Sequence, residues 1–508
     1  MTGVACPFLD ELRARAEERP AAIAIRDGGV PTTYRELVTR VDRRAAELTA
    51  AGLRMHDRVA VVADNSATYL VSAFAVWAAG GVLVTVYPSS GQADLAHCLS
   101  SSAPTVVLSD SRLVDDVRSA AGPDVVVLDI HDRIPEGLRL PRVADPEPMP
   151  EDLALICYTS GSTSRPKAVM HRHRGLWGAA RAFARVWHVG PDDRTIVCLP
   201  MAWAFGLVTT SMTTLLAGGT VLPLARTKPE LLVDTMAEEG ATFLAGVTTI
   251  FAKLVEYLRG LAQVPHLSTL RLCISGGEPR NERVFDGWAE LTSCAVHDNF
   301  AASECFPVIT YDPIEDPVPV PRSAGKVIEG AGMRVIDPAT GRDVRPGTPG
   351  EALWRGPALF AGYWRDPDAT AKALTDDGWY RTSDLVRVDE RGYVFVEGRL
   401  SDMIIRGGSN VSPSEVEAVV RAHVDVRDVA VVGVPDATYG QSVVAVVVAA
   451  DVERFDSARV AAWCRTQLAG YKVPTSFVTV DALPLNPATG KVDRRTIVAQ
   501  LASTEGVA

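Results

Sequence analysis

The segment LALICYTSGSTSRPKAVMHRHRGL, residues 153–176, is the most informative stretch of the chain. It begins with an apolar run typical of a buried strand, continues with small and hydroxyl-bearing residues, and leads into a helix-like stretch, residues 174–187. Such a loop between a strand and a helix can surround phosphate oxygens with backbone N–H groups and hydroxyl donors. Lys167 adds a positive charge, but Pro166 before it excludes the common nucleotide P-loop, which requires Gly-Lys-Ser/Thr. A run of Ser, Thr and Gly alone would favour an ordinary polar loop, whereas the complete string with Pro-Lys favours a phosphate site.

Short apolar runs alternate with helix-like segments on both sides of this loop. Strands that alternate with helices predict an α/β fold, with parallel sheets covered by helices on both faces. The eight runs found fit two doubly wound layers better than one. They are VAVVA from Val59, PTVVLS from Pro104, DVVVLD from Asp124, LALICY from Leu153, TIVCLP from Thr195, GTVLPL from Gly219, TFLAGV from Thr242 and LRLCIS from Leu270.

The pattern changes after residue 320, where strand-rich runs such as EALWRG and GYVFVEG are joined by Gly and Pro turns. These runs predict a small β-barrel or antiparallel sheet. Farther along, the helix candidates PSEVEAVVRAH and SARVAAWCRTQLAG enclose two strand candidates, which predicts a small α+β domain whose first helix is capped by Ser412 or Ser414. We therefore expect a large N-terminal domain over residues 1–400 and a small, mobile one over residues 401–508.

The composition restricts the class of protein. With 508 residues the chain is too long for one ordinary core. Its formal net charge of −11 argues against a broad nucleic-acid surface, and no run approaches the roughly 20 apolar residues of a membrane helix. The eight cysteines are scattered without a CxxC pair, which predicts reduced thiols in a cytoplasmic protein and no cysteine metal site.

Four further motifs follow the loop along the chain: SGGEP (residues 275–279), DNFAASE (298–304), GWYRTSDL (378–385) and PLNPATGKVDRR (484–495). Taken singly, each could be a turn or a solvated segment. Together with the loop, and in this order through nearly the whole chain, they resemble the adenylate-forming superfamily of acyl-CoA synthetases, adenylation domains and firefly luciferase. The resemblance implies ATP-dependent activation of a carboxylic acid as an acyl-adenylate, with release of pyrophosphate.

The resemblance also implies which residues bind the nucleotide. Glu304 is the expected Mg²⁺ ligand, because a hard cation between phosphates requires a carboxylate oxygen. Asp384 would accept hydrogen bonds from both ribose hydroxyls, Phe300 would offer its ring to adenine, and Asn299 would bond the adenine amino group. The expected ATP contacts are Thr159, Ser160, Gly161, Ser162, Thr163 and Lys167 in the loop; Gly276, Gly277 and Glu278 in the turn; Asn299, Phe300, Ala301, Ala302 and Ser303 before Glu304; and Asp384 with Arg399.

Members of the family catalyse two half-reactions and rotate the C-terminal domain between them. The hinge of this rotation follows the Gly-Arg pair, so we expect it at Ser401. In the first half-reaction Lys491 would stabilise charge while the carboxylate attacks phosphorus and pyrophosphate leaves. In the second, Gly407 and Gly408 would let the narrow pantetheine arm of CoA approach the adenylate. The resemblance thus assigns catalysis to Lys491 together with Glu304 and Lys167.

Two segments, LPMAWAFGL from Leu199 and AGVTTIF from Ala245, resemble those that line the acyl pocket of the family. No acidic residue occurs between Leu199 and Leu216, so a substrate ammonium group would lack a counter-charge, and a buried unpaired cation is costly. We therefore expect an aryl, alicyclic or bulky natural-product acid from secondary metabolism, as in benzoate-type acyl-CoA ligases. Plain core packing is the competing interpretation of each aromatic residue. The expected pocket residues are Trp203, Phe205, Gly206, Val247, Thr248, Ser275 and Cys305.

Several alternatives stay open. The acyl acceptor is CoA or, for a stand-alone adenylation enzyme, a separate acyl carrier protein, and the chain could act as a homodimer. A luciferase-like oxygenase would oxidise its own adenylate. A non-catalytic nucleotide-binding relative is suggested by departures from the family pattern, although every charged group of the motifs is present. The departures are Ser164, Ala168 and Ser383 in place of Gly and Ser401 in place of Asp or Lys.

Overall fold

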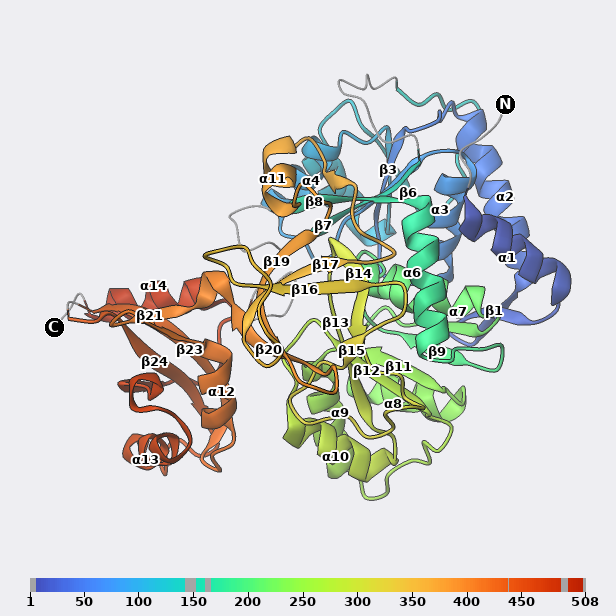
Figure 1. Cartoon of the computed structure of the whole chain (residues 1–508). Helices are drawn as coiled ribbons and strands as arrows, with labels where there is room; N and C mark the ends of the chain where they lie inside the picture. The colour runs from blue at the N-terminus through green and yellow to red at the C-terminus, as the bar shows by residue number, and fades with distance from the viewer. Residues whose placement is uncertain (1–5, 142–151, 160–165, 437, 486–491, 506–508) are drawn as a thin grey trace. The chain divides into compact units, whose positions relative to one another are not determined.

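The fold is described from a computed structural model of the chain (Figure 1). None of the described helices combines the length and the apolar character needed to cross a membrane. The structure describes residues 6–141, 152–159, 166–436, 438–485 and 492–505.

Contacts between Cα atoms divide the chain into two compact units. The first contains residues 1–333 and 354–381, and the second contains residues 334–353 and 382–508. The boundary expected at residue 400 concerns domain motion, which this division does not test, and it stays a prediction.

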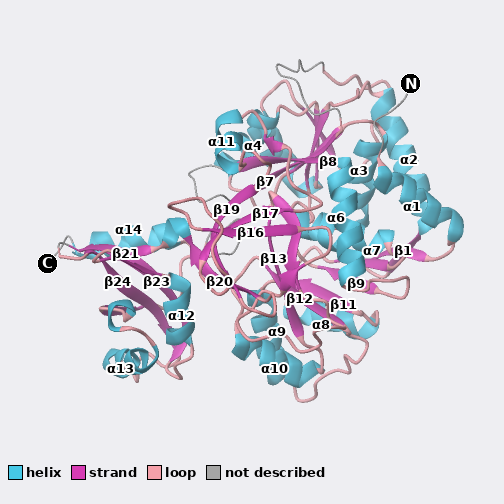
Figure 2. Ribbon diagram, viewed as in Figure 1, coloured by secondary structure: helices cyan, strands magenta, loops and turns pink. Residues whose placement is uncertain are grey.

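The first unit contains a nine-stranded sheet that is parallel in its centre and antiparallel at both edges. Helices α8 (Pro229–Glu238), α9 (Thr248–Gly260) and α10 (Glu282–Thr292) lie beside its central strands (Figure 2). The strand order is β15 (Lys326–Val327), β14 (Cys305–Thr310), β13 (Val296–Ala302), β12 (Leu272–Gly276), β11 (Phe243–Gly246), β9 (Arg194–Val197), β10 (Thr220–Pro223), β1 (Ile23–Asp27) and β2 (Val30–Thr33).

The same unit contains a seven-stranded sheet, again parallel except at one edge. The two predicted doubly wound layers are therefore confirmed. The strand order is β18 (Gly362–Tyr363), β8 (Lys167–Arg172), β7 (Leu153–Thr159), β4 (Val82–Thr85), β3 (Arg58–Val62), β5 (Val106–Ser109) and β6 (Val126–Asp129).

Helices α2 (Tyr34–Ala50) and α3 (Ala67–Ala78) begin where the sequence supplies acceptors for their first N–H groups. Thr33 and Glu36 form a reciprocal capping box at the start of α2, and the Ser66 hydroxyl accepts from Tyr69 N at the start of α3. A π-helix, in which the backbone bonds span five residues, covers residues 205–212. The remaining helices are α1 (Pro7–Glu18), α2 (Tyr34–Ala50), α3 (Ala67–Ala78), α4 (Gln92–Ser102), α5 (Val114–Ala121), α6 (His173–Val186), α7 (Thr213–Leu216) and α11 (Pro367–Ala373).

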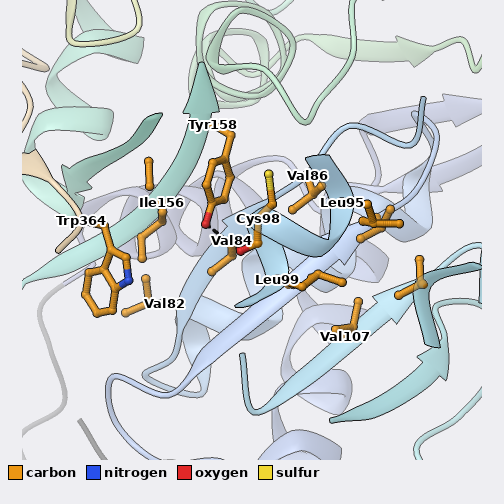
Figure 3. Close-up of a cluster of buried hydrophobic side chains, with 14 of the residues drawn as sticks. Val82, Val84, Val86, Leu95, Cys98, Leu99, Val107, Ile156, Tyr158 and Trp364 are labelled. Carbon is orange, nitrogen blue, oxygen red and sulfur yellow. Dashed lines mark hydrogen bonds between the residues drawn. The ribbon is translucent and has the colours of Figure 1, made fainter. Parts of the chain in front are cut away.

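One buried cluster packs the central strands of the seven-stranded sheet against α4 (Figure 3). The Tyr158 hydroxyl donates to the Cys98 carbonyl oxygen at 2.7 Å, which satisfies a buried polar group at the end of β7. Trp364 belongs to the same cluster and donates its indole N–H to the Ser101 carbonyl oxygen at 2.9 Å. The GYW sequence around residue 363 is therefore anchored in this core.

Two further sheets contain the remaining described strands. For the region after residue 320 the sequence predicted a small β-barrel or an antiparallel sheet, and the described strands form a four-stranded sheet. Its strand order is β16 (Gly332–Ile336), β17 (Gly350–Arg355), β19 (Tyr380–Val388) and β20 (Val394–Arg399). The other sheet has the order β22 (Ser409–Val411), β21 (Ile404–Arg406), β24 (Gly440–Ala449) and β23 (Val426–Asp436), and β25 (Ser476–Thr479) also pairs with β24.

The predicted α+β composition of the C-terminal segment is confirmed. Its helices are α12 (Pro413–Arg421), α13 (Ser457–Gln467) and α14 (Arg494–Glu505). Ser412 caps α12, as expected, because its hydroxyl accepts a hydrogen bond from Glu415 N.

Candidate active site

The phosphate-loop candidate joins two antiparallel strands. β7 pairs with β8 from Leu153↔Arg172 to Thr159↔Lys167, and α6 begins only at His173. The prediction that the loop leads into a helix is therefore wrong, because residues 167–172 form strand β8, which pairs with β7 and β18, before the helix starts. Lys167 stands on this strand, and its Nζ lies 4.9 Å from the centroid of the Tyr363 ring. Ser160, Gly161, Ser162, Thr163 and Ser164 lie outside the described residues.

Four predicted segments meet at the carboxyl edge of the nine-stranded sheet, because β9, β11, β12 and β13 are parallel and end there. Gly246 pairs with Ser275, and Gly276 pairs with Asn299. Motifs far apart in sequence thus become neighbours. The carboxyl ends of parallel strands are where open α/β sheets bind ligands. The segments brought together are residues 199–207 after β9, 247–251 after β11, 275–279 at the end of β12 and 298–304 around the end of β13.

The glycines of the 275–279 turn are packed against two pocket aromatics. A Cβ on Gly276 would stand 2.9 Å from Phe205 Cε1, and one on Gly277 would stand 2.7 Å from Trp203 Cη2. Gly277 also has a φ of +81°, which disfavours other residues. The predicted nucleotide turn and the predicted acid pocket therefore share a wall, with the Trp203 and Phe205 rings edge to face at 5.4 Å.

Glu278 has a local task at the start of α9. Its carboxylate accepts from Thr249 N at 2.8 Å and from the Thr249 hydroxyl at 3.0 Å. Val247, the residue before the helix, has no capping side chain, so Glu278 supplies the missing acceptor. Thr248 donates to the Pro279 carbonyl oxygen at 2.8 Å. These bonds fix the turn to α9, and a contact of Glu278 with adenine stays a prediction.

The 298–304 motif forms the turn between β13 and β14, in which Ala302 pairs with Cys305. Asn299 is buried, and its Oδ1 has no hydrogen-bond partner among the described residues. Buried acceptors are normally satisfied, so an unpaired amide oxygen fits the predicted bond to the adenine amino group. The half-buried Phe300 ring meets Trp354 edge to face at 5.0 Å. Ala301, Ala302 and Ser303 are also half-buried, whereas Cys305 is fully buried.

An ion pair joins this motif to the turn beside it. Arg280 donates to Asp298 at 2.5 Å and to Glu282 at 2.9 Å. Burial raises the pKa of Asp298 to about 6, although Arg280 opposes the shift. The pair holds the 275–279 turn against β13.

Glu304 is buried in this turn and is held on several sides. Its Oε1 accepts from the Tyr363 hydroxyl at 2.8 Å, and its carbonyl oxygen accepts from Phe360 N at 2.8 Å. His171 Nε2 contacts the Ser303 carbonyl oxygen at 2.7 Å. Burial lowers the pKa of His171 to about 4, so the ring is neutral at pH 7 and donates this bond.

The donor set around Glu304 suits a cation shared with phosphates. Among the described residues no group of three or more His, Cys, Asp or Glu side chains could enclose a metal by itself. Mg²⁺ is commonly held by one or two carboxylates together with substrate phosphates and water. A single buried carboxylate therefore fits the expected metal, with Glu304 as its ligand from the protein.

The predicted ribose residues lie in the second unit. Asp384 pairs with Arg399 across β19 and β20, and Arg399 Nε donates to Asp384 Oδ1 at 2.8 Å. Asp384 is buried, while more than half of the Arg399 side chain is exposed. Ser383 before it has a φ of +57°, a conformation that glycine adopts without strain. The backbone thus keeps a glycine-like conformation where the family usually has glycine.

Gly407 and Gly408, the glycines predicted to act in the second half-reaction, form a tight hairpin turn between β21 and β22. Arg406 pairs with Ser409, and Gly407 and Gly408 have φ values of +56° and +79°. Positive φ at both central residues is required by type I′ turns, which accounts for the two glycines locally. Their role toward a pantetheine arm stays a prediction.

The hinge candidate Ser401 lies in a short 3₁₀ turn. The segments on its two sides are joined by hydrogen bonds from the Ser412 and Ser414 hydroxyls to the Glu397 carbonyl oxygen. Lys491 lies outside the described residues, but the ends of its loop are closed by pairing of Leu485 with Val492. Both assignments stay predictions.

The tertiary structure adds residues that the sequence motifs did not assign. Tyr363 lies in the sequence GYW, residues 362–364, and His171 lies in the segment 153–176, but neither was assigned a role from the sequence. Asn65 lay outside all motifs, and its side chain bonds the backbone at residues 197, 199, 201 and 224, just before the pocket aromatics. Gly206 is required in the π-helix because a Cβ there would stand 2.6 Å from the Leu199 carbonyl oxygen.

Comparison with known proteins defines the family. The model of the AMP-binding enzyme family matches residues 12–364, and that of the AMP-binding enzyme C-terminal domain matches residues 415–491. The chain therefore belongs to the AMP-binding enzyme family, which is the adenylate-forming superfamily.

Individual relatives match along almost the whole chain. A feruloyl-CoA synthase of Amycolatopsis sp is 35% identical, with 94% of this chain and 96% of that protein covered. A 3-[(3aS,4S,7aS)-7a-methyl-1,5-dioxo-octahydro-1H-inden-4-yl]propanoyl:CoA ligase of Rhodococcus jostii (strain RHA1) is 32% identical, with 95% and 96% covered. The crystal structure of ATP-bound MatB from Rhodopseudomonas palustris superposes with a TM-score of 0.87 at 33% identity, covering 97% of this chain and 98% of that one.

Proposed function

We propose that this chain is an AMP-forming acid–CoA ligase that uses ATP and Mg²⁺ to activate a carboxylic acid and then transfers the acyl group to CoA. The observation that carries the proposal is the hairpin of β13 and β14. It presents the Asn299 amide oxygen, which has no hydrogen-bond partner within the described part of the chain, and the buried Glu304 carboxylate on one short segment. The first suits an adenine amino group and the second suits a cation on the triphosphate.

The first half-reaction transfers the adenylyl group to the acid. A carboxylate oxygen attacks the α-phosphorus, the bond to the β-phosphate oxygen breaks, and pyrophosphate leaves. When bound, Mg²⁺ supplies positive charge against the phosphate oxygens. Lys167 would bind the outer phosphates, Asp384 would orient the ribose, and Lys491 would stabilise the charge that develops during attack. In the second half-reaction the CoA thiol attacks the acyl carbonyl, and AMP leaves.

We propose an acid with an uncharged aromatic or alicyclic tail. Trp203 and Phe205 form apolar walls against the 275–279 turn, and the segments 199–207 and 247–251 contain no charged residue. A second carboxylate or an ammonium group on the acid would find no counter-charge in these two segments, and burying an unpaired charge is costly. The names of two relatives, a feruloyl-CoA synthase and an indenyl-propanoyl:CoA ligase, agree with this class.

CoA rather than a carrier protein is the proposed acceptor. Beside the Gly407–Gly408 turn, the Tyr439 ring is half exposed, the Arg406 guanidinium lies 5.3 Å from its centroid, and Arg406 donates to the Tyr471 carbonyl oxygen at 2.9 Å. A half-buried cation beside a half-exposed tyrosine ring suits the phosphates and base of a nucleotide. A carrier protein presents no such base.

An acid panel tests the proposal. Pyrophosphate release is measured over aromatic, alicyclic, fatty and amino acids, with and without CoA, and the product is identified by mass spectrometry. An aromatic or alicyclic preference with an acyl-CoA product supports it. A preference for amino acids or long fatty acids would overturn the substrate class, and a CoA-independent end product would overturn the acceptor.

We also propose a cellular location and an oligomeric state for the protein. All eight cysteines are buried free thiols, and burial raises the pKa of Cys157 to about 12. Unpaired thiols suit a reducing compartment, so we propose the cytoplasm. A homodimer stays a proposal that light scattering would test.

A further inference from the structure

Tyr363 lies between two charged side chains that the proposed function directs to the same triphosphate. Its hydroxyl donates to Glu304 Oε1 at 2.8 Å, and the Lys167 ammonium stands 4.9 Å from its ring centroid. Glu304 lies in the turn between β13 and β14 of the nine-stranded sheet, and Lys167 lies on β8 of the seven-stranded sheet. The Tyr363 side chain thus connects Glu304, the candidate metal ligand, with Lys167, the candidate phosphate ligand.

The backbone around Tyr363 is fixed before any ligand binds. Residues 362 and 363 pair with 170 and 169 on β8, and Trp364 N donates to the Ala168 carbonyl oxygen at 2.8 Å. Tyr363 N donates to the Thr370 hydroxyl at 2.9 Å. Gly362 has a φ of +122° and no room for a Cβ, which would stand 2.9 Å from Thr370 Cγ2. The backbone that carries the ring is therefore held by β8 and by Thr370.

The chemistry of the phenol matches this position. The Tyr363 hydroxyl is buried and 2.8 Å from Glu304 Oε1, and because a carboxylate oxygen only accepts, the phenol O–H donates this bond. A donor on one carboxylate oxygen fixes the rotation of the group and directs the other oxygen. The ring face attracts the Lys167 ammonium at the same time.

We infer that Tyr363 is a positioning residue that sets the Glu304 carboxylate for the metal and the Lys167 ammonium for the phosphates. The inference rests on the proposed function, because it needs a metal–nucleotide complex at this place. It assigns two separable effects to one side chain, the hydroxyl acting on the metal and the ring acting on the lysine.

Two substitutions separate these effects. Tyr363→Phe keeps the ring and removes the hydroxyl, so the apparent Mg²⁺ constant should weaken by about tenfold or more, as for other partners that orient a metal ligand. The KM for ATP at saturating Mg²⁺ should stay nearly unchanged. Tyr363→Leu also removes the ring, so the KM for ATP should rise by about two- to fivefold in addition.

Metal binding can also be measured without catalytic turnover. Mn²⁺ binding in the presence of a non-hydrolysable ATP analogue is followed by electron paramagnetic resonance for each variant. Tyr34→Phe is the matched control, because it removes an equally buried hydroxyl that donates to Leu215 and Gly219 carbonyl oxygens. It should lower stability without changing the Mn²⁺ constant. Equal Mn²⁺ constants for Tyr363→Phe and Tyr34→Phe would overturn the inference.

A third measurement does not depend on a truncated side chain. 3-Fluorotyrosine at position 363 should lose its ¹⁹F signal by paramagnetic broadening when Mn²⁺ and the ATP analogue bind, whereas fluorotyrosine at position 34 should not. An unbroadened signal at 363 with Mn²⁺ bound would place the metal elsewhere. If the wild-type chain shows no acid-dependent pyrophosphate exchange, the proposed function fails; if exchange is normal and the variants match the wild type, only the inference fails.

Discussion

Replacing Asn65 with alanine should both destabilise the first unit and loosen the acid pocket. Its Nδ2 donates to the carbonyl oxygens of Val197, Leu199 and Leu224 at 3.0, 2.8 and 3.2 Å, and its Oδ1 accepts from Met201 N at 2.7 Å. At about 1 kcal/mol net for each bond, with buried groups left unpaired, the free energy of unfolding should fall by about 3–5 kcal/mol. The residues released lead directly to Trp203 and Phe205, so kcat/KM for the acid should fall by about tenfold or more.

Urea denaturation measures the first effect, and pyrophosphate release at varied acid concentration measures the second. Asn281→Ala is the control, because this asparagine makes one capping bond to Val284 N and should cost only about 1 kcal/mol. The KM for ATP should be nearly unaffected by Asn65→Ala. A destabilisation no greater than that of the control, or an unchanged acid kcat/KM, would refute the claim that Asn65 organises the pocket wall.

Three further substitutions test other parts of the site. Asn299→Ala should raise the KM for ATP by about fivefold to thirtyfold, the value of one buried hydrogen bond, while the KM for the acid stays constant; unchanged ATP kinetics would remove Asn299 from the adenine site. Ser383→Gly should raise stability by about 1 kcal/mol in thermal unfolding, because it relieves a positive φ, and a loss of stability would contradict this. Buried His171 has its pKa lowered to about 4 from an ordinary value of 6.5, so the unfolded state binds more protons between these values and stability falls as the pH drops from 6.5 toward 4. His171→Gln should flatten this part of the pH–stability curve by up to about 3 kcal/mol, and an unchanged slope would show that the acid loss arises elsewhere.

The alternation of strands and helices could be predicted from the sequence because it is a local property. The runs from Val59, Thr195 and Leu270 are strands of the two sheets, and Ser412 caps α12 as its side chain indicated. The strand β8 was missed because residues 167–172 follow a polar loop and precede a helix, so their alternation is short and is masked by both neighbours.

The arrangement of the site was harder to predict from the sequence, because its contacts join residues that are distant in sequence. Tyr363 and Glu304 are 59 residues apart, and only the approach of β18 to the turn between β13 and β14 brings them together. Asn65 bonds residues more than 130 positions away, and nothing in its neighbourhood signals this. The π-helix around Phe205 depends on the close approach of Gly206 to the backbone at Leu199, which local propensity does not encode.

The most direct test of the account is acid-dependent exchange of pyrophosphate into ATP, with mass spectrometry of the enzyme-bound product. The account predicts exchange that requires the acid and Mg²⁺ but not CoA, together with an acyl-adenylate. It also predicts that Lys491→Ala folds normally and loses exchange by orders of magnitude. Exchange without any acid, or wild-type exchange in Lys491→Ala, would contradict the account.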